Sequence, residues 1–202
     1  MKIKIVKALY WLSLKSRWYK YWSKLYRKLF HSKYKNVKLN KYDSLEDLQR
    51  NLFFVRYQKD GAKELWDVVG SPNWVQHVMN LNKKDKLVNG ALDCDDFSIY
   101  SAYTYVPKEN EYVFLYSMLY TTPKGFPGFS GHMICCVYNP IESKYYAVGN
   151  WGLSSFSSYE ELVKYMECDD QFIGCAVFDP FTLNVLEISL DRNTDVIKKC
   201  SK

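Results

Sequence analysis

Two apolar runs flank a turn in the second half of the chain, and this pattern limits the possible folds more than any other. The first run, residues 133–138, is typical of a buried strand, and the second, residues 144–148, returns after the turn. Together they predict an antiparallel hairpin. His132 and Asn150 stand at equal distances from a turn centred near residue 141, so we expect them side by side at the open end.

A cysteine among carboxylates marks a second feature, in residues 89–97, where a loop with a glycine gives way to a helical pattern. Asp93 is a natural N-cap and places Cys94 in the first turn, where Asp95 and Asp96 favour the positive end of the helix dipole. Backbone N–H groups at a helix start stabilise a thiolate, whereas neighbouring aspartates oppose it. We therefore expect an imidazolium to hold the thiolate.

Three histidines are available for this role. His31 lies in a lysine-rich segment, His77 lies in a predicted surface helix, and His132 opens the first strand of the hairpin after a loop rich in Pro and Gly. The order Cys94, His132, Asn150 therefore predicts a nucleophile, a base and a carboxamide that orients the base.

These residues resemble the transglutaminase-like and papain-like cysteine enzymes, and most closely the small bacterial and phage transglutaminase-like proteins. The resemblance spans roughly residues 44–165. It rests on residues 93–97 at a helix start, residues 131–132 at a strand start, and residues 150–152 after the next strand.

The resemblance implies Cys94 as nucleophile, His132 as general base and acid, and Asn150 as third member of a triad. Asp93 would support the site, and Trp151 would shield the contact between Asn150 and His132. Transglutaminase relatives usually have Asp at the third position, so the asparagine favours papain-like hydrolysis over other acyl transfers. A fold that has lost its activity is the alternative.

For the oxyanion hole we expect the backbone N–H of Cys94 and one side-chain donor, Asn89 or Trp74. The three aspartates beside Cys94 would suit Mg²⁺ or Ca²⁺, but helix capping explains them more simply. Six cysteines without a CxxC pair and three scattered histidines predict neither a disulfide framework nor a zinc site. We expect no metal, no cofactor and a reducing compartment.

Residues 1–42, which we call the arm, hold thirteen of the 28 basic residues and none of the 22 acidic ones. A segment of charge +13 thus precedes a remainder of charge −7. Trp and Leu recur in the arm at helical spacing, which predicts a basic amphipathic helix. Three alternatives stay open: docking on its own domain or a second copy, an anionic membrane surface, or nucleic acid. We expect the arm to be dispensable for folding.

The sequence therefore predicts the arm and linker at residues 1–42 and an α+β domain at residues 43–202, with a Cys94 helix packed on an antiparallel sheet. Further helices are expected from Ser44, Pro72 and Ser158, and further strands at 112–120, 172–178 and 183–190. The buried face of the Cys94 helix is expected at Ile99, Ala102, Tyr103 and Val106.

The expected function is thiol-dependent hydrolysis of an amide, of cysteine-peptidase or deamidase type, through an acyl-enzyme formed on a peptide or protein substrate. The alternative is a catalytically silent module with a structural or binding role, such as a phage component. No signal peptide and no bilayer-spanning segment is predicted. We expect a cytoplasmic protein, peripheral to a membrane or associated with a virion.

Overall fold

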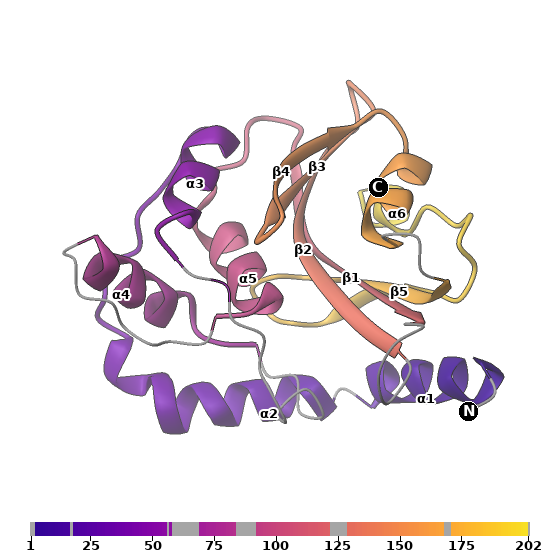
Figure 1. The fold of residues 1–202 in the computed structure, drawn as a ribbon, viewed down its shortest axis with the longest axis horizontal. Coiled ribbons are helices and arrows are strands. Elements are labelled where there is room, and N and C mark those ends of the chain that lie inside the picture. Colours follow the sequence, from indigo (N-terminus) through magenta and orange to yellow (C-terminus); the bar gives the residue numbers. More distant parts are fainter. Residues whose placement is uncertain are drawn as a thin grey trace.

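The protein is described here from a computed structural model, which covers residues 3–16, 18–55, 57, 69–83, 92–121, 129–167 and 171–201. Within these ranges the chain forms an α+β fold around one six-stranded sheet (Figure 1). The strand order is β4-β3-β2-β1-β5-β6, and every neighbouring pair is antiparallel. The strands are β1 (Tyr112–Thr121), β2 (Phe129–Asn139), β3 (Lys144–Gly149), β4 (Gly152–Phe156), β5 (Phe172–Phe178) and β6 (Val185–Ser189).

Helices cover both faces of the sheet (Figure 1). One side carries α3, α4 and α5, the other carries α6, and α1 and α2 run end to end along one edge of the molecule. The helices are α1 (Ile3–Lys15), α2 (Trp18–Tyr26), the π-helix η1 (Arg27–His31), the 3₁₀-helix η2 (Ser32–Tyr34), α3 (Leu45–Leu52), α4 (Pro72–Asn82), α5 (Cys94–Thr104), α6 (Tyr159–Glu167) and α7 (Val196–Cys200). None of the described helices is long and apolar enough to cross a bilayer.

Alternate residues of β2 enter two separate cores, as the two-residue period of a strand requires. Cys135 and Val137 pack on the α5 side, together with Ile99. Ile134 and Cys136 pack on the other side, where α6 and α7 contribute Leu162, Val163, Val196 and Ile197. The sheet is therefore buried on both faces, and both cores are dominated by apolar side chains.

Local sequence signals account for several of the element boundaries. Ser44 Oγ accepts a hydrogen bond of 3.1 Å from Asp47 N and caps α3. Pro72 occupies the first turn of α4. The expectation for α5 was wrong at one end, because the helix ends at Thr104 and Val106 is 40% exposed.

The arm packs against the rest of the protein. Val6 and Leu14 on α1 are 8% and 7% exposed, and Leu14 belongs to the same apolar core as α5. A Cβ on Gly174 of β5 would lie 2.9 Å from the Tyr10 ring, so the glycine leaves room for that ring on the sheet. The first alternative for the arm, docking on its own domain, is confirmed for this inner face.

The second half of the arm is held by polar contacts. Ser23 is fully buried on α2, and its Oγ accepts a hydrogen bond of 3.1 Å from Val69 N. The His31 ring stacks on Trp74 of α4 at 4.6 Å, and His31 Nδ1 accepts a hydrogen bond of 3.0 Å from Ser71 N. These buried contacts give the arm a part in stability, contrary to what its charge pattern led us to expect.

Candidate active site

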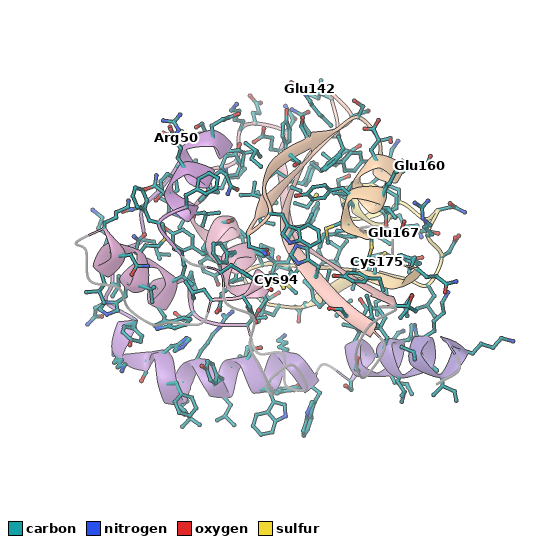
Figure 2. All side chains as sticks on the ribbon, viewed as in Figure 1. Arg50, Cys94, Glu142, Glu160, Glu167 and Cys175 are labelled. Carbon is teal, nitrogen blue, oxygen red and sulfur yellow. The ribbon has the colours of Figure 1, made fainter. Side chains whose placement is uncertain are left out.

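Cys94 is the first residue of α5, as the sequence predicted. It is half-buried, and Figure 2 shows it on α5 in the middle of the molecule. Asp93 takes the N-cap position with extended backbone, and its carbonyl accepts a hydrogen bond of 3.2 Å from Phe97 N. The Asp93 side chain, however, makes no capping hydrogen bond. The thiol therefore stands at the positive end of a helix whose start is set by backbone geometry.

One hydroxyl ties the Cys94 helix to the strand that carries His132. Ser98, one turn after Cys94, directs its Oγ to the Cys94 carbonyl at 2.6 Å and to the Met133 carbonyl at 2.9 Å. Because a hydroxyl has a single hydrogen, the two carbonyls share it as a three-centre bond. The backbone of Cys94 and the backbone next to His132 are thereby fixed to each other.

The hairpin register differs by one residue from the expected one. Asn139 pairs with Lys144, which leaves a four-residue loop whose centre lies half a residue beyond the expected position. Asn139 Oδ1 accepts hydrogen bonds from Ile141 N and Glu142 N, and Ser143 adopts a positive φ of 51°, so the loop conformation sets its length. A shift of one residue moves a side chain to the other face of a sheet.

Trp151 lies in the two-residue turn between β3 and β4, and its ring lies on that of His132. The rings of Trp151 and His132 stack at 3.6 Å with an interplanar angle of 13°. Trp151 also meets Tyr165 of α6 edge to face at 5.6 Å. The role expected for Trp151 was to shield a contact between Asn150 and His132, and the structure shows its ring on His132.

His132 lies on the sheet face that is opposite to α5. Its partner on β1 is Met118, which belongs to the core beneath α6. The ring is buried, with the residue 5% exposed, and burial lowers the pKa of His132 to about 4. At pH 7 the imidazole is therefore neutral, and the imidazolium expected from the sequence is not its resting state.

Two complementary polar atoms at this end of the hairpin have no hydrogen bond with any residue that the structure describes. They are His132 Nε2 and Asn150 Oδ1, and both are buried. Gln49 of α3 holds the neighbouring backbone, because its Nε2 donates to the Gly149 carbonyl at 3.3 Å. A buried polar atom without a partner is costly, so an unused donor or acceptor here points to a functional rather than a packing role.

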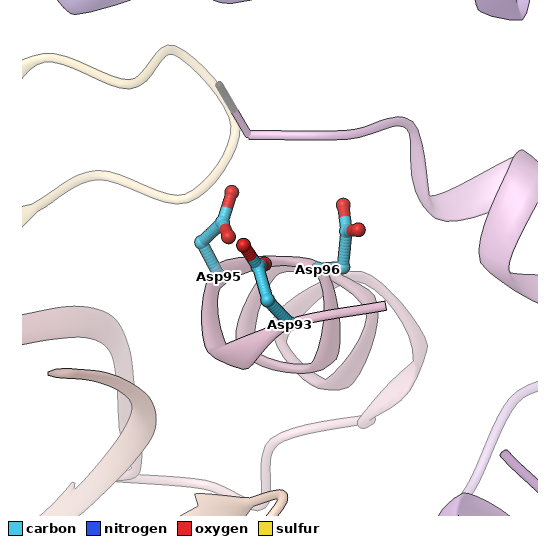
Figure 3. Close-up of side chains that lie close together, drawn as sticks. All are labelled: Asp93, Asp95 and Asp96. Carbon is cyan, nitrogen blue, oxygen red and sulfur yellow. The ribbon is translucent and has the colours of Figure 1, made fainter. Parts of the chain in front are cut away.

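The three aspartates around Cys94 point to the same side of the first turn of α5 (Figure 3). Their oxygens lie within 4.8 Å of one another. Asp96 Oδ1 accepts a hydrogen bond of 2.9 Å from Gly70 N, and a Cβ on Gly70 would lie 2.0 Å from that oxygen. Asp96 therefore binds backbone outside its own helix.

A protein cation lies near these carboxylates. Burial lowers the pKa of Arg27, while Tyr103, Asp96 and Asp95 act in the opposite direction. Arg27 belongs to the arm, and its Nε donates to the Val69 carbonyl at 3.0 Å. The guanidinium thus compensates part of the acidic charge at the start of α5, as a metal ion otherwise would.

Only one of the two residues expected to donate to the oxyanion lies within the part of the chain that the structure describes. Asn89 lies outside the described residues. Trp74 lies on α4, where its ring stacks on His31, so its established contact is with the arm.

Sequence reasoning missed Ser98, Gln49 and Arg27, each of which holds part of this region. Ser98 stands four residues after Cys94 on the same helix face, a spacing that the sequence does display. Gln49 is a polar residue on the apolar face of α3 and gives a similar signal. Arg27 gave no such signal, because it is one of many basic residues in the arm.

Comparisons of the sequence with protein-family models and with curated proteins found no match.

Proposed function

We propose that the protein is a thiol-dependent amide hydrolase with a papain-like or transglutaminase-like arrangement of Cys94, His132 and Asn150. The observation that supports this most is the unused Nε2 of a buried, neutral histidine on the strand to which Ser98 ties the Cys94 backbone. A neutral imidazole carries its proton on one nitrogen and can accept a second proton on the other, which is what a general base requires.

In the proposed reaction Cys94 Sγ attacks the carbonyl carbon of an amide and loses its proton to His132. The resulting tetrahedral oxyanion would be stabilised by the N–H groups and partial positive charge at the start of α5. His132 then passes the proton to the leaving amine, and the carbon–nitrogen bond breaks to give a thioester on Cys94. Water hydrolyses the thioester, again with His132 as base, and regenerates the thiol.

Asn150 would act through His132. Its Oδ1 is an acceptor without a described partner, and His132 Nε2 is a nitrogen in the same condition. A hydrogen bond between them would fix the tautomer that leaves Nδ1 as the proton acceptor. The substrate would be a peptide or protein amide.

A catalytically silent module is the second candidate, and one specific observation favours it. The His132 ring stacks on Trp151 on the α6 side of the sheet, whereas α5 packs on the other side. Catalysis requires the imidazole within hydrogen-bond reach of Cys94 Sγ. In a module without activity, the stack would serve only to close the hairpin end.

Trapping the thioester separates the two candidates. The full chain is incubated with a library of fluorogenic peptide amides, and intact-mass spectrometry follows acylation while fluorescence follows turnover. The hydrolase predicts an acyl adduct on Cys94 and release of the amine, both lost in Cys94→Ala and reduced by at least about a hundredfold in His132→Gln. Turnover that persists in Cys94→Ala would contradict the proposal, and so would an adduct on another cysteine.

A further inference from the structure

The arm has a second apolar surface that faces away from the sheet. Figure 1 shows α1 and α2 along one edge of the molecule, and Figure 2 shows side chains projecting outward from both helices. Seven large side chains on α1, α2 and η1 are more than half exposed, and we call them the arm surface: Ile5 (51%), Leu9 (54%), Leu12 (55%), Trp18 (57%), Tyr21 (62%), Leu29 (63%) and Phe30 (59%). So many large exposed apolar groups on three consecutive helices are unusual for a monomer in water.

The arm surface is separate from the face that holds the arm in place. Val6, Leu14 and Ser23 are each less than a tenth exposed and anchor the inner side of the same two helices. Docking on the sheet therefore consumes one face of the arm and leaves the other available. The arm surface serves no purpose in the fold described above.

Basic side chains surround the arm surface. Lys4, Lys15, Lys24 and Lys28 are all exposed, and the arm contains no acidic residue. Trp, Tyr and aliphatic side chains among lysines match the boundary between anionic headgroups and acyl chains, where the rings lie at the interface and the lysines meet phosphate.

Other occupants fit the arm surface less well. Nucleic acid would pair with the lysines but offers little that would bury Leu9, Leu12 and Leu29. A second copy of the chain would bury these residues but would bring two segments of charge +13 together. An anionic bilayer satisfies both the apolar and the charged groups.

We propose that the arm surface lies on anionic phospholipid, with its apolar side chains in the interface and the inner face of the arm still docked on the sheet. The helices lie along the bilayer plane, since none of the described helices could span it. This inference is independent of the proposed hydrolase activity, because it uses none of the residues assigned to catalysis.

Flotation of the full chain with phosphatidylcholine vesicles, with and without about one third phosphatidylserine, tests the proposal. We expect binding to the anionic vesicles only, and at least about a tenfold weaker binding for the triple variant Leu9→Gln, Leu29→Gln and Phe30→Gln. The matched control replaces three exposed apolar residues outside the arm: Phe53→Gln, Ile141→Gln and Leu186→Gln. This control should bind like the unmodified chain, and circular dichroism should report the same fold for all three proteins.

The charge component is tested with Lys4→Gln, Lys24→Gln and Lys28→Gln. Each change should weaken vesicle binding by about fivefold, and salt should weaken it further. Equal binding to neutral and anionic vesicles would overturn the proposal, as would an equal loss in the control variant. It would also be overturned by duplex DNA binding without vesicle binding, or by a dimer that the triple apolar variant dissociates while vesicles remain unbound.

Discussion

His31 and His132 stand in similar surroundings. Each ring stacks on a tryptophan, Trp74 at 4.6 Å and Trp151 at 3.6 Å, and each residue is 5% exposed. The pKa of each falls to about 4, mainly through burial, with Arg27 and Lys33 contributing at His31. The rings differ in their nitrogens, because His31 Nδ1 accepts the Ser71 N–H at 3.0 Å, whereas His132 Nε2 has no described hydrogen bond.

This difference separates a structural histidine from a candidate base. Burial and stacking are common to both sites, so neither feature by itself indicates catalysis. His31 uses its acceptor nitrogen to bind backbone and thereby fastens the arm to α4. His132 keeps a nitrogen that folding does not use, on a strand that Ser98 joins to Cys94. We therefore expect the His31 region to contribute to the stability of the fold and the His132 region to contribute to the reactivity of Cys94.

Removing the arm should have the largest effect. A chain that begins at Tyr42 lacks the His31 stack and the buried Leu14 side chain, and we expect it to lose its cooperative thermal transition. The single change Leu14→Ala should cost about 2–4 kcal/mol, because it leaves a cavity in the core. Leu9→Ala, on the exposed face of the same helix, should cost less than about 0.5 kcal/mol. Urea unfolding measures both, and equal small losses would show that the arm does not support the core.

Acid should destabilise the protein through both histidines. Each has a pKa of about 4 when folded against an ordinary value of 6.5, so the unfolded chain binds more protons between these pH values. The stabilisation is complete above pH 6.5 and is lost as pH falls towards 4, on the order of 3 kcal/mol for each histidine.

The check is the free energy of unfolding between pH 7 and 4. His31→Gln and His132→Gln should each flatten this dependence. If neither variant alters the slope, the two rings are not buried as neutral groups.

Substitutions of Trp74 and Trp151 perturb the two histidines separately. We expect a smaller effect from them than from acid. Trp151→Ala should expose the His132 ring and raise its pKa by about one unit towards 6.5, while the pKa of His31 stays where it is. Trp74→Ala should raise the pKa of His31 and leave the pKa of His132 where it is. Titration of the two imidazole ring protons by NMR follows both sites in one sample. Movement of both values in either variant would indicate global loosening instead of local exposure.

Changes at Asn150 should be smallest. Because Asn150 Oδ1 is not bonded to His132 in the folded protein, Asn150→Ala should lower the reactivity of Cys94 by less than about tenfold, well below the effect of His132→Gln. Asn150→Asp should be tolerated, since a carboxylate can also accept a hydrogen bond from an imidazole N–H. Alkylation of Cys94 at neutral pH measures both variants. A loss as large as that of His132→Gln would mean that Asn150 orients the ring more strongly than the hairpin register indicates.

Features that depend on residues close together in the sequence were predictable. The start of α5 at Cys94, the α3 cap at Ser44 and the α+β class agree with expectation, because each depends on spacing and capping over a few residues. The C-terminal tail shows the limit, because residues 191–202 are mostly polar, yet Val196 and Ile197 among them are fully buried.

Features that depend on distant contacts were not predictable in the same way. The hairpin register depends on a four-residue loop in which Asn139 Oδ1 accepts a backbone hydrogen bond, and the stack of Trp151 on His132 forms in the next turn. The arm docks against residues that lie far along the chain, and one example is Gly174, which leaves space for the Tyr10 ring. Charge alone suggested an appendage, because the sequence does not reveal which face of an amphipathic helix is buried.

The rate of iodoacetamide modification at Cys94, read site by site by mass spectrometry at pH 7, tests the central claim most directly. Cys135 and Cys200 serve as internal references, because burial raises their pKa values to about 12 and about 11. The account predicts that Cys94 reacts at least about tenfold faster than Cys200, that His132→Gln removes this advantage, and that folded His31→Gln keeps it. An unchanged Cys94 rate in His132→Gln would contradict the account, and so would equal losses in the two histidine variants.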